Sequence, residues 1–308
     1  MQFDSSARRK LTSGTPLSRA GGRSTLPSAS QPVALLGLGF IGTSLGLALR
    51  RGGVAVRGYD RGRRSGAAAR RRGAVSVLAP TAAEAVRGAR LVVLCVPPRA
   101  VAPVLRAARP CLDRLAVVTD TVSVKASVLG EVRRHLPRSG RFVGGHPMAG
   151  GERSGPRAGR ADLFRDRLVV LTPDRGTAPP ALRVVRRMWQ AVGARVLLMS
   201  AARHDAVAAV TSHQPHVAAF ALAAALVDPH VARMAAGSFL DATRVAVADA
   251  RLWVEILLAN RAAVRQAVRA QRRREDAVMA ALGRGAVGDL VRRLEAAARL
   301  RRRAGGSG

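Results

Sequence analysis

Cysteine, lysine and aromatic residues are all scarce in this chain of 308 residues. The two cysteines, Cys95 and Cys111, are too few for a disulfide framework and form no CxxC motif, so we expect two reduced thiols. Aromatic residues make up only 3%, which means that the core must be built from Ala, Val and Leu. The length predicts two domains.

The sequence also has no convincing membrane anchor. Its longest uncharged stretch, residues 206–227, is long enough to cross a bilayer but contains Ser212, His213 and Gln214, so a helix buried between protein surfaces fits better. Residues 1–30 are rich in Ser, Arg, Gly and Pro and have no apolar segment, which predicts a disordered leader rather than a secretory signal. We therefore expect a cytoplasmic protein.

Acidic residues are few, 19 against 52 basic ones, and the formal net charge is +33. A charge of this size can attract nucleic acid or anionic metabolites. The basic residues other than Lys10 and Lys125 are all arginine, however, and they are scattered through every segment with few aromatics among them. This pattern indicates a compositional bias, and we expect no specific nucleic-acid partner. The isolated Lys125 suggests a site that requires a compact ammonium group.

Predicted strands and helices alternate from Pro32 to about residue 174, which is typical of an α/β fold with a Rossmann-type, doubly wound parallel sheet. After a Pro- and Gly-rich segment at 172–180 the pattern is almost wholly helical. The predicted strands are 33–36, 55–59, 91–96, 115–119, 142–144 and 168–171. The predicted domains are a disordered leader (1–30), a dinucleotide-binding domain (31–176), an all-α domain (177–303) and a flexible tail (304–308).

The first predicted strand is followed by the dinucleotide-binding fingerprint GLGFIG at residues 37–42. Its glycines allow a tight turn, close approach of a pyrophosphate and close packing of helix on strand. Asp60 ends the second strand, where its carboxylate would bind ribose hydroxyls and favour NAD. Neighbouring arginines, Arg63 and Arg64 among them, could pair with a 2′-phosphate and keep NADP possible. The candidate cofactor-binding residues are Gly37, Gly39, Phe40, Ile41, Gly42, Asp60, Arg61, Val96 and Pro97.

Further polar clusters occur at residues 119–125 and 145–155, where later strands should end, and at 204–216 and 237–244 in the helical half. Ligands of open α/β sheets bind at the carboxyl ends of strands, so the first two clusters are candidate site segments. The pair His213 and His216 lacks a carboxylate or cysteine that would complete a ligand set, and we expect no metal site.

Together these segments resemble the prephenate and arogenate dehydrogenases of tyrosine biosynthesis. The resemblance covers residues 32–262 and depends on GLGFIG, TDTVSVK, GGHPMAGGERSG, HDAVAAVTSHQPH and FLDATRVA, in that order. It implies NAD(P)-dependent oxidative decarboxylation of prephenate to 4-hydroxyphenylpyruvate, or of arogenate to tyrosine. It also implies a homodimer formed by the helical domain, with the active site between the two domains. Gln214 replaces a residue that is usually apolar in the family, which leaves the choice of substrate open.

The resemblance assigns roles to individual residues. His146 would be the catalytic base at the ring hydroxyl, which Ser123 would orient. Arg244, oriented by Asp241, would bind the ring carboxylate of the dianionic substrate through its guanidinium. The other implied substrate-site residues are His216, Ser212, His213, Gly237, Glu152 and Lys125, and His204 is expected nearer the cofactor.

Two other functions remain open from the sequence. A β-hydroxyacid dehydrogenase or a pyrroline carboxylate reductase would share GLGFIG but has no evident need for GGHPMAGGE or LDATRVA. A nucleotide-responsive protein could use its positive charge to hold nucleic acid, and salt-dependent DNA binding without NADH production would favour it. The motifs favour prephenate dehydrogenase.

Overall fold

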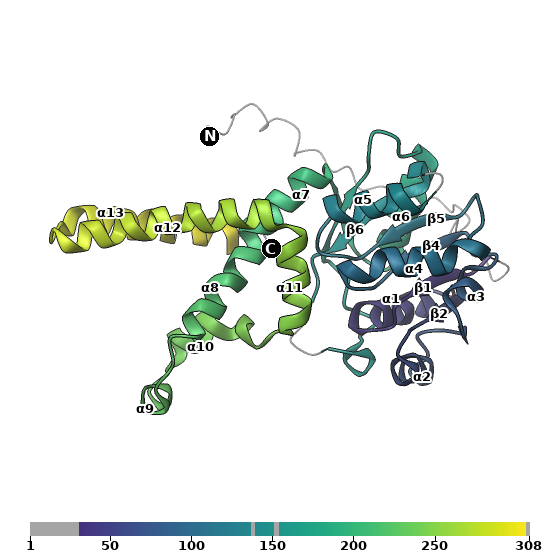
Figure 1. Cartoon of the computed structure of the whole chain (residues 1–308), viewed down its shortest axis with the longest axis horizontal. Helices are drawn as coiled ribbons and strands as arrows, with labels where there is room; N and C mark the ends of the chain where they lie inside the picture. Colours follow the sequence, from purple (N-terminus) through teal and green to yellow (C-terminus); the bar gives the residue numbers. More distant parts are fainter. Residues whose placement is uncertain (1–30, 137–138, 151–153, 306–308) are drawn as a thin grey trace, which may run out of the picture.

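An eight-stranded sheet forms the N-terminal half of the chain (Figure 1). The computed structural model describes residues 31–136, 139–150 and 154–305, so the expected leader lies outside the described residues. The strands are arranged in the order β3-β2-β1-β4-β5-β6-β7-β8. Their bounds are β1 Val33–Leu36, β2 Val56–Tyr59, β3 Val77–Leu78, β4 Leu91–Leu94, β5 Val117–Asp120, β6 Phe142–Pro147, β7 Leu168–Thr172 and β8 Arg195–Leu198.

Neighbouring strands are parallel from β3 through to β6, whereas β7 runs antiparallel to β6 and parallel to β8. The predicted α/β class is therefore confirmed, with a sheet that is mostly rather than wholly parallel. A parallel pair needs a long crossover connection, usually a helix. The described part of the β6–β7 connection contains the short turn η5, Pro156–Ala158, and no crossover helix, in keeping with the antiparallel pairing.

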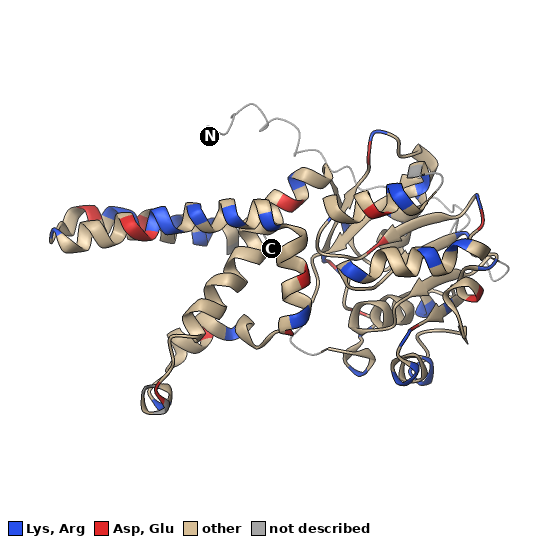
Figure 2. Ribbon diagram, in the orientation of Figure 1, with Lys and Arg blue, Asp and Glu red and all other residues tan. Residues whose placement is uncertain are grey.

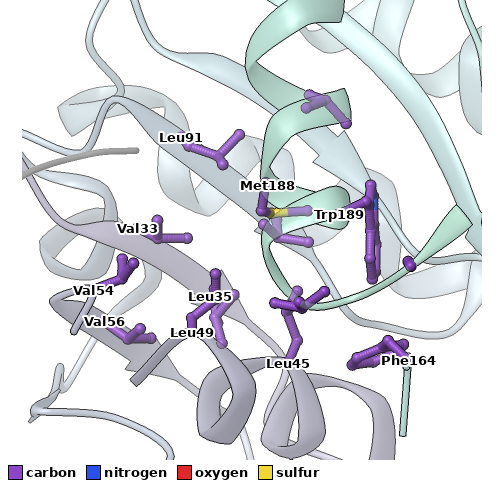
Figure 3. Packing of buried hydrophobic residues seen from close by; sticks show 14 of the residues in the cluster. Val33, Leu35, Leu45, Leu49, Val54, Val56, Leu91, Phe164, Met188 and Trp189 are labelled. Atoms are coloured by element: carbon purple, nitrogen blue, oxygen red, sulfur yellow. The ribbon is translucent and has the colours of Figure 1, made fainter. Parts of the chain in front are cut away.

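Helices cover both faces of the sheet, which is why the inner strands β1 and β4 are apolar at every position. Val33 and Leu35 point into one core, with Trp189 and Phe164, and Figure 3 shows these side chains packed together. Leu36 points into the opposite core. The covering helices are α1 Phe40–Arg51, α2 Arg63–Arg71, α3 Ala82–Val86, α4 Val101–Ala108, α5 Ala126–His135 and α6 Pro179–Ala191.

The C-terminal half is helical, and its last two helices form a long hairpin that extends away from the sheet (Figure 1). A π-helical turn, η6, joins the first two helices where Pro215 has no N–H to donate to the preceding turn. The helices are α7 Ala201–Ala208, η6 Ala209–His213, α8 Gln214–Ala223, α9 Pro229–Arg233, α10 Gly237–Thr243, η7 Arg244–Val247, α11 Ala250–Ala259, α12 Arg261–Gly283 and α13 Val287–Gly305.

The structure corrects the predicted boundary between the two halves. Helix α6 packs on the sheet and β8 pairs with β7, so residues 177–198 belong to the sheet and not to the helical half. The strand was missed because its apolar run, residues 196–199, is short and closely follows a helix, and such a run cannot be told from a helical segment by periodicity. Residues 304 and 305 of the expected tail end α13, and the rest of that tail lies outside the described residues.

Lys and Arg residues occur along both halves of the ribbon, including the α12–α13 hairpin (Figure 2). Within the described ranges, no helix is both long enough and apolar enough to cross a bilayer.

Candidate active site

The glycine-rich loop between β1 and α1 has the backbone geometry that phosphate binding requires. Gly37 has a φ of +100°, and a side chain there would overlap the carbonyl oxygen of Cys95. A side chain at Gly42 would overlap the carbonyl oxygen of Gly37, whereas the space beside Gly39 is open. The first turn of α1 has neither an acidic residue nor a side-chain cap. The loop therefore offers an accessible helix N-terminus at which an anion can bind.

A cavity of about 680 Å³ lies in front of this loop. The carboxylate of Asp60 forms part of its wall and accepts the N–H groups of Leu38 (2.7 Å) and Gly62 (2.7 Å), one on each oxygen. Because each carboxylate oxygen has two lone pairs, both can still accept a ribose hydroxyl. Six sequence-predicted residues line the cavity: Gly37, Gly39, Asp60, Arg61, Val96 and Pro97.

The other predicted cofactor residues lie near this cavity or away from it. Phe40 and Ile41 are in the first turn of α1 and pack against the hydrophobic core. Arg63 and Arg64 line an adjoining cavity of about 540 Å³. His204 does not line this cavity: its ring is buried and lies between His146 and Asp205. Its place nearer the cofactor stays a prediction.

His146, on β6, is the first member of a buried series of polar groups. Its Nδ1 lies 2.8 Å from Nε2 of His204, and Nδ1 of His204 lies 2.8 Å from Oδ1 of Asp205. The Asp205 carboxylate also accepts the backbone N–H groups of Lys125 (2.8 Å) and Ala126 (2.9 Å). Two residues of α7, His204 and Asp205, thus join β6 to the start of α5, across the boundary between the two halves.

The series continues through Asn260 to a second histidine. The Asn260 side-chain amide donates to the backbone carbonyl of Asp205 (2.8 Å) and lies 3.1 Å from Nδ1 of His213. Because an amide NH₂ group only donates, Nδ1 of His213 accepts and its proton is on Nε2. That Nε2 is buried and has no hydrogen-bond partner among the described residues.

Trp253 of α11 brings the two histidines of the helical half together. The ring of His216 stacks on it, and the ring of His213 contacts it edge-on with centroids 6.0 Å apart. Nδ1 of His216 donates to the carbonyl of Ser212 (2.9 Å), and the charge of Arg244 is close enough to act on His216. His213, His216, Ser212 and Arg244 therefore lie in one region. The shared substrate pocket expected of them stays a prediction.

Burial and neighbouring charges keep these histidines neutral. Burial, with the charges of Lys125, His204 and His213, lowers the pKa of His146 well below 6.5. Burial lowers the pKa of His213 to about 4. The pKa of His216 is lowered by burial and by Arg244 against the opposing effect of its bond to Ser212. An imidazole that is neutral at working pH can accept a proton.

Lys125 does not lie in a position to bind substrate, which corrects its assignment. Its side chain is 1% exposed, and its ammonium pairs with Asp120 and donates to the carbonyl of Gly145 (2.6 Å). Asp120 in turn accepts the N–H groups of Gly145 (3.0 Å) and Val122 (3.0 Å). The compact ammonium inferred from the sequence is therefore used to hold the ends of β5 and β6 together.

Three other predicted residues have less defined positions. Ser123 is half-buried on the loop that follows β5, the strand next to β6. Gly237 begins α10, which packs against α8, and has open space where a side chain would be. Glu152 lies outside the described residues.

Sequence reasoning missed two residues of this region. Asp205 was noticed only as part of a motif, and its link to His146 depends on a contact that spans 58 residues. Glu255 of α11 lines the cavity in front of the glycine-rich loop and accepts the N–H of Arg99 (3.1 Å). No motif surrounds Glu255, so the sequence carried no signal for it.

The comparisons with known proteins agree with this arrangement. The family model described as prephenate dehydrogenase, nucleotide-binding domain, matches residues 45–198, and the one described as prephenate dehydrogenase, dimerization domain, matches residues 200–296. The chain is 41% identical over 236 residues to the cyclohexadienyl dehydrogenase of Zymomonas mobilis, a match that covers 74% of this chain and 80% of that protein. It is 32% identical over 237 residues to the prephenate dehydrogenase of Bacillus subtilis, covering 74% of this chain and 64% of that protein.

Solved structures give the same result. The prephenate dehydrogenase of A. aeolicus, solved with hydroxyphenyl propionate and NAD+, has a TM-score of 0.84 at 32% identity and covers 89% of this chain and 98% of its own. The arogenate dehydrogenase of Synechocystis has a TM-score of 0.77 at 27% identity and covers 89% of this chain and 100% of its own. The predicted family and enzyme class are confirmed: the chain belongs to the prephenate dehydrogenase family and is an oxidoreductase of that class.

Proposed function

We propose that this chain converts prephenate to 4-hydroxyphenylpyruvate and CO2 with NAD+ as the oxidant. The observation that supports this most strongly is the series of contacts that connects His146, at the carboxyl end of β6, with Arg244 in the helical half. It brings a neutral base and a cation into one region of the fold. These are the two groups that a cyclohexadienol carrying a ring carboxylate requires.

The dinucleotide cavity fits NAD. The open backbone at Gly39 and the N-terminus of α1 would hold the pyrophosphate, and Asp60 would bind the adenosine ribose. A 2′-phosphate would place negative charge against the Asp60 carboxylate, which favours NAD over NADP. When bound, NAD+ accepts the hydride from ring carbon C4 of the substrate.

His146 would act at the C4 hydroxyl. Its Nδ1 faces His204, so Nε2 is the nitrogen left to accept the hydroxyl proton as the C–O bond gains double-bond character. The ring C1–carboxylate bond then breaks, its electron pair enters the ring, and the aromatic product regains the proton as a phenol. No net proton is released, so the base only has to hold the proton during the reaction. We propose that Ser123, on the neighbouring strand end, orients the same hydroxyl.

Arg244 would bind the ring carboxylate of the substrate, because a guanidinium donates two parallel hydrogen bonds to a carboxylate. His216, next to Arg244 and fixed by Trp253, would contact the substrate side chain. Arogenate is the second candidate substrate. Gln214 occupies a position that is usually apolar in the family. Its side-chain amide donates to Gln271, whose amide donates to Glu275 (2.5 Å). This part of the region is therefore polar, which is why arogenate stays a candidate.

The matched dimerization domain indicates a homodimer. We propose that the apolar surface of the helical half forms its interface. Large apolar side chains are exposed along α8, α11 and α12, and burying such a set would stabilise a dimer. They include Leu222, Leu252, Val254, Leu258, Met279 and Leu282.

The proposal is tested by mixing the protein with NAD+ or NADP+ and with prephenate or arogenate, and by following the absorbance of the reduced cofactor. We expect the highest kcat/KM with NAD+ and prephenate.

His146→Asn keeps an amide that can reach His204 but removes Nε2, so kcat should fall at least about 100-fold with little change in KM. Arg244→Gln should instead raise KM for the substrate about 100-fold, whereas Arg251→Gln on the exposed surface of α11 should not. Turnover by His146→Asn at the wild-type rate would exclude this assignment.

A further inference from the structure

The three groups His146, His204 and Asp205 form a linear series that is closed to solvent at its far end. His204 is 1% exposed and Asp205 5% exposed, and both nitrogen–nitrogen and nitrogen–oxygen distances are 2.8 Å. These distances are those of direct hydrogen bonds and leave no room for a water molecule between the groups. Each group can therefore determine which nitrogen of the next one carries a proton.

The ionisation of Asp205 fixes the direction of these hydrogen bonds. Burial alone would raise the pKa of Asp205, but the bonds from His204 and from the backbone of Ala126 and Lys125 lower it overall, so the carboxylate is ionised and can only accept. Nδ1 of His204 must then carry a hydrogen. In the neutral ring this leaves Nε2 of His204 as an acceptor, so His146 must donate through its own Nδ1. The lone pair of His146 is thereby placed on Nε2.

We propose that Asp205 and His204 are positioning residues that form a proton relay behind His146, an inference that rests on the proposed function of His146 as the base. When Nε2 of His146 takes the hydroxyl proton of the substrate, the Nδ1–H bond of His146 breaks and an Nε2–H bond forms on His204. His204 becomes an imidazolium that is paired with the Asp205 carboxylate. As the phenol forms, the same transfers run in reverse, so that no proton is gained or lost.

The surroundings favour the charge on His204 over His146. His204 contacts a carboxylate directly, whereas the groups that act on His146 are the ammonium of Lys125 from the β5–α5 loop and the titratable rings of His204 from α7 and His213 from η6. All three disfavour a positive charge on His146. A proton held on His146 alone would be opposed by these groups. Transfer of the proton to His204 places the positive charge next to the carboxylate of Asp205.

Two substitutions at His204 separate the relay from simple packing. Asparagine places its amide where His204 has Nδ1, so His204→Asn keeps the contact with Asp205 and loses the one with His146. Glutamine places its amide where His204 has Nε2, so His204→Gln offers an oxygen to the Nδ1–H of His146 and preserves its tautomer, but cannot take up the proton. Direct substitution of Asp205 is less informative, because its carboxylate also caps the N-terminus of α5.

The expected order of kcat with prephenate and NAD+ is wild type, then His204→Gln, then His204→Asn. We expect a loss of about 10-fold for glutamine and about 100-fold or more for asparagine, with KM for both substrates within about threefold of wild type. Equal losses in the two variants, or a wild-type kcat in His204→Asn, would overturn the relay. If His146→Asn also retained wild-type turnover, the fault would lie in the proposed base and not in the relay alone.

A second readout does not depend on turnover. In full-length protein labelled with 15N-histidine, without cofactor or substrate, the long-range 1H–15N spectrum identifies which ring nitrogen of each histidine is protonated. We expect His146, assigned by the loss of its signals in His146→Asn, to be the Nδ1–H tautomer in wild type and in His204→Gln. In His204→Asn it should shift toward Nε2–H. An Nε2–H tautomer of His146 in the wild-type protein would overturn the proposal even if the enzyme is active.

Discussion

The imidazole of His216 lies flat on the indole of Trp253, with ring centroids 3.5 Å apart and ring planes inclined by 22°. The same indole contacts His213 edge-on, so one residue of α11 positions two histidines that come from α8 and from the π-helical turn before it. Stacking restricts the orientation of His216, which a hydrogen bond to the Ser212 carbonyl then completes. The indole thus fixes the orientation of both histidines.

Replacing Trp253 should affect substrate binding more than the chemical step. Trp253→Leu removes the stacking surface, and we expect KM for prephenate to rise about 5- to 10-fold while kcat stays within about threefold. The measurement is initial-rate kinetics at saturating NAD+. Trp189→Phe is the matched control: Trp189 is buried against Phe164 in the sheet core, so this variant should lose stability and keep its KM. An unchanged KM in Trp253→Leu would mean that His216 does not need the indole.

The choice between NAD+ and NADP+ should depend on Asp60. In Asp60→Ser the carboxylate no longer repels a 2′-phosphate, and Arg61, Arg63 and Arg64 are available to pair with it. We expect the ratio of kcat/KM for NADP+ to that for NAD+ to rise at least about 10-fold. Asp113→Ser is the control, since Asp113 also accepts one backbone N–H, that of Leu115, but does not line the dinucleotide cavity. If the NADP+ to NAD+ ratio rose equally in Asp60→Ser and Asp113→Ser, the carboxylate of Asp60 would not determine the choice of cofactor.

The buried pair of Lys125 and Asp120 should stabilise the fold without binding substrate. Lys125→Met leaves the Asp120 carboxylate buried without its cation, so the free energy of unfolding should fall by about 3–5 kcal/mol, measured by urea denaturation. Arg133→Met breaks an exposed pair with Asp174 and should cost less than about 1 kcal/mol. The folded fraction of Lys125→Met should keep the wild-type KM for prephenate. A large rise in KM with no loss of stability would instead restore Lys125 to the substrate site.

Stability should fall as the pH is lowered, because His213 is held neutral. Its pKa is about 4 in the folded protein against 6.5 for the unperturbed side chain, so between these values the unfolded chain binds more protons and the free energy of unfolding decreases with decreasing pH. This one residue accounts for a loss of up to about 3 kcal/mol across that interval. Above pH 6.5 His213 does not contribute to the change of the unfolding free energy with pH.

The variant His213→Asn tests this, because its amide oxygen can still accept from Asn260 but does not titrate. Urea denaturation at pH 7 and pH 5 should show a smaller difference in unfolding free energy for His213→Asn than for wild type. His230→Asn, at an exposed position, should behave as wild type. If both variants kept the full pH dependence, the burial of His213 would not be its source.

Much of the dinucleotide half could be predicted because its signals are local. The GLGFIG turn, the apolar strands on either side of it and Asp60 are determined by backbone geometry and burial within about one βαβ unit. The edge strand β8 was missed because its short apolar run, residues 196–199, fits a helical segment as well as a strand.

The residues of the candidate site were predicted one by one, but the contacts between them were not. His146, His213, His216 and Arg244 belong to motifs that the sequence displays, whereas Lys125, which was placed in the substrate site, is buried beside Asp120. A motif indicates that a residue is needed and does not say which way its side chain points.

What the amino-acid sequence determined by itself was the family, the α/β class and the set of candidate site residues, because these depend on residue types at short spacings. Tertiary structure alone decided that His146 bonds to His204, that Lys125 is paired with Asp120 inside the protein, and that Trp253 orders two histidines. Hydrogen-bond direction and burial arise only when distant segments pack against one another, and the packing of α7 and α11 against the sheet sets them here.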